Sequence, residues 1–362
     1  MGESINRLRF DPFMAYRKSR GKMTRSRKIE PAVKTMVFNY AVDTDTFDSK
    51  TIDISQCASL LNRRFYRQGI NWAVGSIKIL SVGSQIGNIA ISKLPETWVM
   101  SNAWEKAYHA YRKMNSEALE ESESLRPRFE DFKIYADTIH HTAGYVANLL
   151  PTYDVLTAVP AVPGEWESSK IAQPVTGPAA TDPGEVFERE ILAVGASYPG
   201  TSPATGYNAV SLIEGYANSR ALPSIRDPNL PDDGQDTDGG SPENWLGSLF
   251  NEGTQQSSEV LGVLTTENNQ APYPFENDGV HLDTMYPNGE AQLTGLQIHD
   301  LDTITGTTVG GITRLKGGLF PCGLVRVDIK NTSTELQMGV SVIIDLVPGT
   351  HRGYLCQPMQ DM

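Results

Sequence analysis

Lysine and arginine side chains crowd the start of the sequence and are its clearest chemical signal. The first 28 residues carry nine basic and two acidic residues, a net charge of +7, whereas the other 334 carry 22 and 41, a net of −19. Ammonium and guanidinium groups at this density neutralise phosphates and release their counterions. We therefore expect an amino-terminal arm to bind nucleic acid through these residues: Arg7, Arg9, Arg17, Lys18, Arg20, Lys22, Arg25, Arg27 and Lys28.

A second, smaller basic cluster lies among aromatic residues. Arg63, Arg64 and Arg67 flank Phe65 and Tyr66. Guanidinium groups bind phosphates and aromatic rings stack on bases, so this segment is a candidate wall for single-stranded nucleic acid. A solvated turn or a contact between subunits is the favoured interpretation of the same five residues, and nucleic-acid binding the alternative.

The best candidate for a metal site is an acidic loop before Gly239 and Gly240. Its carboxylate oxygens suit a calcium ion that neighbouring subunits could share. The spacing does not fit an EF-hand, because the first ligand position falls on Gly234 and the twelfth on Trp245. A solvated loop is the favoured interpretation, and calcium the alternative. The four carboxylates are Asp232, Asp233, Asp236 and Asp238.

The sequence lacks the signatures of common enzymes. Residues 195–199 miss the second glycine of a nucleophile elbow, and none of the six histidines stands in an HExxH pattern. His140 and His141 are expected to point to opposite faces of a strand, which suits no single metal ion. We therefore expect neither catalysis nor a cofactor.

The composition predicts a folded, turn-rich chain. It has 362 residues, 39% of them hydrophobic, and its 32 glycines and 22 prolines favour short strands joined by turns. No apolar run reaches 18 residues and the basic start has no signal-peptide core, so we expect no membrane insertion. Cys57, Cys322 and Cys356 are odd in number and far apart, which predicts buried thiols in a reducing compartment.

Hydrophobic periodicity predicts where the strands lie. Alternation from Met36 to Val42 indicates a strand with one buried face, so we divide the chain into an arm, 1–33, and a folded domain, 34–362. The next strand, Ile70–Ile79, changes its apolar parity at Gly75, which indicates a bulge. A further strand covers Ile86–Leu94. Near the end, Val325–Lys330 and Leu336–Leu346 alternate on either side of a polar turn and are predicted to form a hairpin.

Helices and long loops occupy the middle of the chain. Asn102, with Glu105 as a capping-box partner, is the predicted start of the best helix, and a second helix is expected over Asn208–Arg220. Strands are expected over Phe132–Ala136 and Glu185–Ala196. Surface excursions are predicted near 150–184 and 197–300, and residues 171–302 hold 20 acidic residues and three arginines, so this face should point away from phosphate.

Several phrases of the sequence resemble capsid proteins of circular Rep-encoding single-stranded DNA viruses, in particular marine ones similar to bacilladnaviruses. The similarity spans most of residues 60–330 and contains no catalytic residue. The phrases that carry it are residues 62–74 (NRRFYRQGINWAV), 92–95 (SKLP), 97–106 (TWVMSNAWEK), 211–213 (SLI), 215–217 (GYA), 219–220 (SR), 244–246 (NWL), 267–269 (ENN), 286–287 (YP) and 320–324 (FPCGL).

This resemblance implies an all-β fold: a single jelly roll of two antiparallel four-stranded sheets with inserted helices and long surface loops. It also implies self-assembly of many copies into an icosahedral shell around a circular single-stranded DNA genome, so the expected location is the virion, with assembly in the host nucleus or cytoplasm. The arm is shorter and poorer in arginine than circovirus tails. A host surface receptor is not specified by the sequence.

Two other functions fit the same residues. Phosphate contacts do not distinguish DNA from RNA, so the coat of an RNA virus on a related jelly roll is one alternative. A carbohydrate-binding or hydrolytic β-sandwich, with aromatic and acidic loops as its site, is the other.

Overall fold

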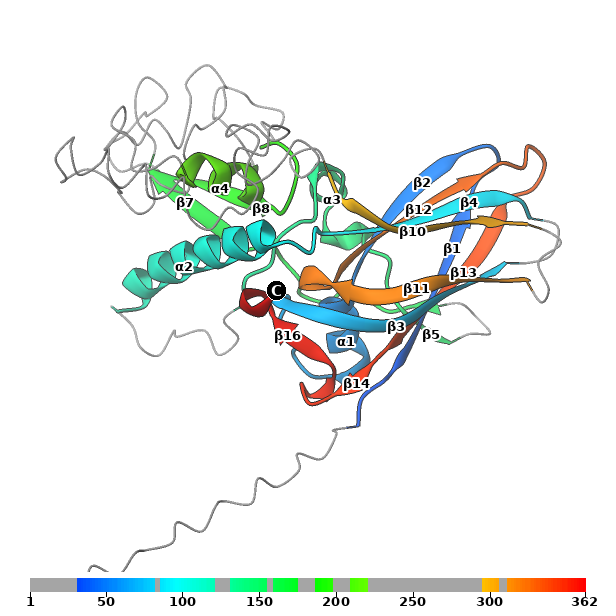
Figure 1. The fold of residues 1–362 in the computed structure, drawn as a ribbon, viewed down its shortest axis with the longest axis horizontal. Helices are drawn as coiled ribbons and strands as arrows, with labels where there is room; N and C mark the ends of the chain where they lie inside the picture. Colours follow the sequence, from blue (N-terminus) through cyan, green and yellow to red (C-terminus); the bar gives the residue numbers. More distant parts are fainter. Residues whose placement is uncertain are drawn as a thin grey trace, which may run out of the picture.

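The computed structural model describes residues 31–81, 85–120, 131–154, 159–174, 186–197, 209–220, 295–305 and 311–362. Within these ranges the protein is mostly β, and its long strands form two antiparallel sheets (Figure 1). One has the order β1-β13-β3-β11, with β16 beside β3, and the other the order β10-β4-β12-β2. The strands are β1 Thr35–Val42, β2 Phe47–Asp53, β3 Ile70–Ser81, β4 Gly87–Lys93, β10 Gln297–Ile304, β11 Ile312–Phe320, β12 Leu324–Asn331, β13 Met338–Leu346 and β16 Cys356–Pro358.

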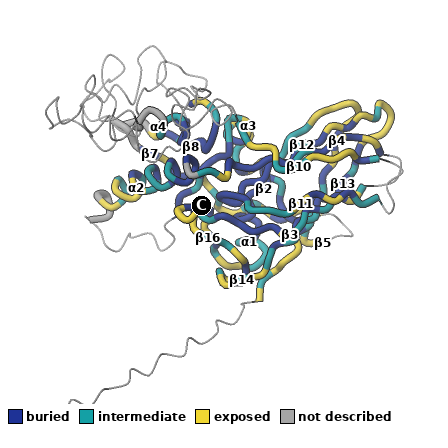
Figure 2. The backbone as a smooth tube through the Cα atoms, in the orientation of Figure 1, coloured by how far each residue is buried: buried dark blue, intermediate teal, exposed yellow. Residues whose placement is uncertain are grey.

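The strands of both sheets contribute to one hydrophobic core. Every second residue is buried along β1, from Met36 to Val42, and along β13, from Met338 to Leu346, which confirms the predicted alternation. Figure 2 shows these buried stretches running through both sheets. Each fully buried aliphatic side chain is worth roughly 1.5–3 kcal/mol relative to an exposed one, so this shared core is the main stabilising feature of the sheets.

The last two long strands do not form the predicted hairpin. β12 pairs with β2 and β4, whereas β13 pairs with β1 and β3, so the connection between them passes from one sheet to the other. Both strands bury one face in the same core from opposite sides, and alternation alone does not distinguish this arrangement from a hairpin. Leu336, predicted to share the buried parity, lies in the connection and is 53% exposed.

A bulge interrupts β3 where its apolar parity changes, as predicted. The register between β3 and β13 shifts from the pair Ser76 and Asp345 to the pair Val74 and Leu346, which leaves Gly75 unpaired. The backbone is crowded here, because a Cβ on Gly317 of β11 would lie 2.3 Å from the Gly75 carbonyl oxygen. Only glycine fits this position without a shift of the strand. The first sheet also has a fifth strand, β16, which pairs with β3. The sequence predicted only four strands in each sheet.

Helices and a small sheet form the other half of the molecule (Figure 1). They are α2 (Trp98–Glu120), α4 (Leu212–Arg220) and the strands β7 (Lys170–Pro174), β8 (Val186–Leu192) and β9 (Ala209–Ser211). A second hydrophobic cluster joins them, with buried residues from α2, α4 and the segment after Asp131. This cluster also contains Leu94 and Leu324 at the ends of β4 and β12, so the two halves pack together.

Three boundaries in this half differ from the predicted ones. α2 begins at Trp98 rather than Asn102, because the Thr97 hydroxyl accepts a hydrogen bond from the Met100 N–H at 3.4 Å and starts the helix a turn earlier. The helix expected over 208–220 begins only at Leu212, since residues 209–211 pair with β8. The expected strand over 132–136 is extended and buried, but only Tyr135 forms a bridge, to Leu192.

The excursion predicted over 150–184 is partly ordered into sheet. Its described part contains β5 (Thr152–Asp154), β6 (Val159–Pro160) and β7, and Ile171 is fully buried. Most of the excursion over 197–300 lies outside the described residues. Cys57 and Cys322 are buried free thiols, as predicted, and Cys356 is half-buried.

We predict that Met338→Asp prevents the sheets from closing. Met338 is fully buried on β13, and a carboxylate there would lose its hydration without a partner. The variant should yield no soluble folded protein, as measured by circular dichroism and thermal melting. Leu336→Asp, two residues earlier and exposed, is the matched control and should melt like the wild type; similar melting of both variants would contradict the facing of β13.

Candidate nucleic-acid interface

Residues 63–69 join α1 (Ile54–Asn62) to β3 and carry three of the arginines predicted to bind nucleic acid. α1 begins after Asp53 because this carboxylate caps it, accepting hydrogen bonds from the backbone N–H groups of Ser55 at 2.8 Å and Gln56 at 3.2 Å. The helix ends at Arg63, which has a left-handed φ of 53°. The chain turns there, and the side chains of the arginines at 63, 64 and 67 are exposed.

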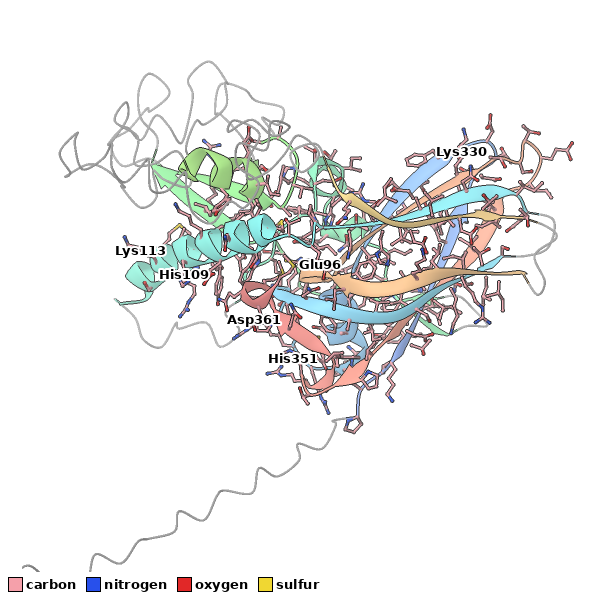
Figure 3. All side chains as sticks on the ribbon, in the orientation of Figure 1. Glu96, His109, Lys113, Lys330, His351 and Asp361 are labelled. Carbon is pink, nitrogen blue, oxygen red and sulfur yellow. The ribbon has the colours of Figure 1, made fainter. Side chains whose placement is uncertain are left out.

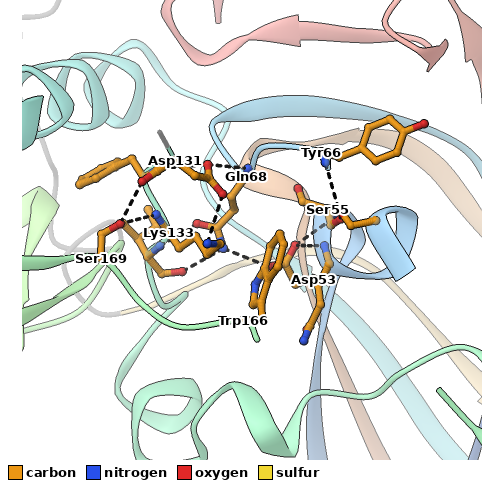
Figure 4. A network of polar contacts seen from close by, with 12 residues as sticks. Asp53, Ser55, Tyr66, Gln68, Asp131, Lys133, Trp166 and Ser169 are labelled. Carbon is orange, nitrogen blue, oxygen red and sulfur yellow. Dashed lines mark hydrogen bonds and ion pairs between the residues drawn. The ribbon is translucent and has the colours of Figure 1, made fainter. Parts of the chain in front are cut away.

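The buried side chain of Gln68 holds this turn in place (Figure 4). Its Oε1 accepts a hydrogen bond from the Ile134 N–H at 2.7 Å, and its Nε2 donates to Asp53 Oδ2 at 3.1 Å. Its backbone N–H donates to Asp131 Oδ1 at 3.3 Å, and Trp166 Nε1 donates to Asp53 Oδ2 at 3.0 Å. One amide side chain therefore connects the helix cap, the turn and the extended segment after Asp131.

Two carboxylates in this network are buried, and their pKa values reflect it. Burial raises the pKa of Asp53 to about 6, although hydrogen bonds from Gln56, Gln68 and Trp166 oppose the shift. Burial also raises the pKa of Asp131, against the ammonium group of Lys133, which lies 3.6 Å from Oδ2. The network is thus electrostatically costly, and a change that removed one of its donors would leave buried charge uncompensated.

Tyr66 holds the turn from the other side. Its ring packs against Trp72 and Tyr354, with centroids 5.9 and 5.4 Å away, and its hydroxyl donates to the Arg352 carbonyl oxygen at 3.0 Å. The Arg352 guanidinium in turn donates to the Phe65 carbonyl oxygen. The prediction that Tyr66 stacks on bases is wrong, because its ring is fully buried in the core.

The first described residues lie against this turn. The Val33 N–H donates to Asn62 Oδ1 at 2.9 Å, the Tyr354 hydroxyl donates to the Val33 carbonyl oxygen at 2.6 Å, and Arg64 Nη1 donates to the Pro31 carbonyl oxygen at 3.4 Å. The arm-bearing end of the domain and the second basic cluster therefore occupy one region of the surface. The sequence predicted both clusters separately and gave no sign that they adjoin.

A cavity of about 780 Å³ opens beside the turn. Its exposed lining residues are Arg64, Arg67 and Arg352, which place guanidinium groups at its mouth, together with Pro358 and Gln360, and His351 lines it as well. Figure 3 shows His351 at this end of the molecule, near β16, and burial together with the charges of Arg352 and Arg67 lowers its pKa. Deeper lining residues are Phe65, Gly69, Trp104, Tyr108, Asp131 and Phe132.

The structure brings together some of the predicted basic residues and separates others. Arg64 and Arg67 line the cavity, but Arg63 lies over the Tyr153 ring, 6.0 Å from its centroid. Arg352 is a member of the cluster that sequence reasoning missed. It stands alone in the turn between β14 (Pro348–Gly349) and β15 (Gly353–Tyr354), and only the tertiary fold places it beside residue 65.

Most of the remaining predicted site residues fall outside the described part of the chain. The arm residues from Arg7 to Lys28 and the acidic loop from Asp232 to Asp238 lie outside the described residues. His140 and His141 were expected on a strand but lie on the short helix α3 (Thr138–Ala143), where both rings pack edge-on against Tyr135. Across the described ranges, no group of three or more His, Cys, Asp and Glu side chains is arranged to hold a metal ion.

None of the helices in the described part of the chain is both long and apolar enough to span a membrane. Comparison with known proteins gives no relative: no protein-family model, no curated protein and no solved structure matches this chain.

We predict that Asp53 makes the fold less stable as the pH rises. Its folded pKa of about 6 lies above its ordinary 3.8, so the folded state binds the proton more tightly, and stability is lost as the pH rises through that window. The wild type should lose roughly 3 kcal/mol relative to Asp53→Asn between pH 4 and pH 7, as measured by urea unfolding. Asp302→Asn, at an exposed carboxylate of β10, is the control and should leave the pH dependence unchanged; a pH-independent difference between Asp53→Asn and the wild type would contradict the assignment.

Proposed function

We propose that this chain is a viral coat protein, a jelly roll that assembles into an icosahedral shell around a single-stranded DNA genome. The observation that carries the proposal is the strand order. When the eight long sandwich strands are counted along the chain, their orders in the two sheets are 1-8-3-6 and 5-4-7-2. The jelly roll of many viral capsids is built from two Greek keys, and this strand order supports that architecture for the chain.

Charge supports an inner and an outer face. The first 28 residues have a net charge of +7 and lead to Pro31, whose carbonyl oxygen accepts a hydrogen bond from Arg64, whereas the rest of the chain is acidic. A fully extended arm of 28 residues would reach about 90 Å at roughly 3.3 Å per residue, enough to follow a genome strand or a neighbouring subunit. The proposal places the arm and the cavity toward the genome, with the acidic residues facing outward.

Exposed apolar side chains support contacts between copies. Ile298 and Leu301 are 61% and 67% exposed on β10, which lies at the edge of its sheet, and Val146 and Val162 are more exposed still. In a monomer these apolar side chains would face water. The free backbone edge of β10 would also be unpaired, and another chain could pair with it. Burial of such groups between subunits is the assembly force that the proposal requires.

Two alternatives keep support from specific observations. The coat of an RNA virus fits equally, since arginine contacts to phosphate do not discriminate the sugar. A carbohydrate-binding domain also fits, because lectins share the jelly-roll architecture and the cavity contains aromatic residues.

We predict that the purified protein forms closed particles of uniform size. Negative-stain images and light scattering measure this directly, and nuclease digestion of the extracted contents identifies DNA or RNA. A persistent monomer that binds sugars and no nucleic acid would overturn the coat proposal in favour of the lectin alternative.

We predict that neutralising the arm separates packaging from assembly. Seven positions change to Gln: Arg17, Lys18, Arg20, Lys22, Arg25, Arg27 and Lys28. The shell is held by contacts of the folded domain, so particles should still form, but their ratio of absorbance at 260 to 280 nm should drop to that of protein, because the arm's phosphate contacts are lost. Exchanging lysine and arginine within the same seven positions keeps the charge and serves as the control. Unchanged nucleic-acid content in the Gln variant would refute the role of the arm.

A further inference from the structure

We propose that the cavity beside residues 63–69 is a nucleotide pocket, in which one unpaired base enters the aromatic interior while the flanking phosphates stay on the arginines at the mouth. The inference rests on the proposed function and deepens it, because it assigns base contacts where the coat proposal needs only phosphate contacts. At about 780 Å³ the cavity falls in the size range of small-molecule sites.

Charge decides which part of a nucleotide lies inside. The mouth carries Arg64, Arg67 and Arg352, all exposed, whereas the buried wall contains the carboxylate of Asp131. A phosphate pushed inward would approach this carboxylate and leave the guanidinium groups. A neutral base avoids that repulsion, so the arrangement selects a ligand with an anionic end at the mouth and an uncharged planar end inside.

Aromatic rings form the interior. The Trp104 and Tyr108 rings are stacked with centroids 4.9 Å apart, and Phe132 packs against both at 5.8 Å. Tyr108 and Phe65 are only half-buried, so they are the rings that a base can reach. Gly69 lets the Trp104 ring pack directly against the backbone of the turn, because a Cβ at this position would lie 2.3 Å from Trp104 Cζ2.

Two polar atoms in residues that line the cavity lack a hydrogen-bond partner. Asp131 Oδ2 and Trp104 Nε1 are buried, belong to residues that are 8% and 4% exposed, and form no hydrogen bond. The Lys133 ammonium is 3.6 Å from Oδ2, which is beyond hydrogen-bond distance. Buried polar groups are nearly always satisfied, so an unused acceptor and an unused donor in one cavity point to a ligand that offers both. The edge of every nucleobase carries a donor and an acceptor.

The test compares two strands that differ only in their bases. A fluorescently labelled dT12 and a labelled 12-residue abasic deoxyribose-phosphate strand carry the same phosphates, so the arm binds them alike. Fluorescence anisotropy with the full-length protein should give at least about fivefold tighter binding of dT12, since stacking one base on an aromatic ring is worth roughly 5- to 150-fold. Equal affinity of the wild type for both strands would overturn the proposal.

Variants locate the effect. Tyr108→Leu keeps an apolar side chain and removes the ring, so the ratio of the two affinities should fall to about one. Phe65→Leu removes the other half-buried ring of the lining and should also lower the ratio, which provides the test if Tyr108→Leu does not fold. Tyr153→Leu, at a half-exposed ring outside the cavity, is the matched control and should keep the ratio. Preference for dT12 that survives both cavity variants would place the base site elsewhere and overturn the assignment.

A rim variant separates phosphate from base contacts. Arg67→Gln should weaken binding of both strands by the same factor and reduce the slope of log affinity against log salt by about one, leaving their ratio intact. A changed ratio in Arg67→Gln would contradict the division into mouth and interior. If the protein forms particles but binds both strands equally, the pocket is refuted and the coat proposal stands. If it stays a monomer but prefers dT12, the coat proposal is refuted and the pocket stands.

Discussion

The hydrogen bond between Gln68 and Asp53 is the constraint on which the candidate interface depends. Asp53 belongs at once to the end of β2, to the cap of α1 and to the buried network, so the start of the helix and the position of the turn are fixed by one carboxylate. Gln68 transmits this position to the segment after Asp131, which also lines the cavity. Arginine side chains are long and mobile, and it is the buried amide beneath them that sets where their backbone lies.

The same network explains why the cavity combines charges of opposite sign. Asp131 faces the turn because its Oδ1 accepts hydrogen bonds from the Gln68 and Phe132 N–H groups, while its Oδ2 forms no hydrogen bond and lies 3.6 Å from the Lys133 ammonium. The cations stand on exposed loops that meet only in the folded protein, one before β3 and the other before β15. The cavity therefore runs from three exposed arginines at its mouth to an aromatic interior whose wall contains one buried carboxylate.

The local pattern predicted the parts of the fold that local physics decides. Alternation located β1 and β13 and the parity change located the bulge at Gly75, because a period of two records directly which residues are buried. It did not predict which sheet a strand joins, so β12 and β13 were taken for partners. The predicted start of α2 at Asn102 was wrong because the residues there imitate a capping box, while the Thr97 hydroxyl starts the helix.

The candidate site was also predicted only in part, because the sequence shows residues that are neighbours along the chain and not those that the fold brings together. Arg64 and Arg67 were predicted because several arginines stand within a few residues of one another. Arg352 has no other arginine near it in the sequence, and it joins the cluster only through its hydrogen bond to the Phe65 carbonyl oxygen, 287 residues away. Tyr66 looked like a binding residue for the same reason that Phe65 did, since sequence does not tell which of two neighbouring rings turns inward.

The pairing of β1 with β13 has a consequence for how the protein is made. Thr35 and Asp345 are joined although 310 residues separate them, so during translation the first strand leaves the ribosome long before its partner exists. Its apolar face stays uncovered until β13 has been synthesised, a situation in which chaperones commonly protect nascent chains. An uncovered apolar strand can pair with other chains, so β1 is open to wrong pairing until β13 has left the ribosome.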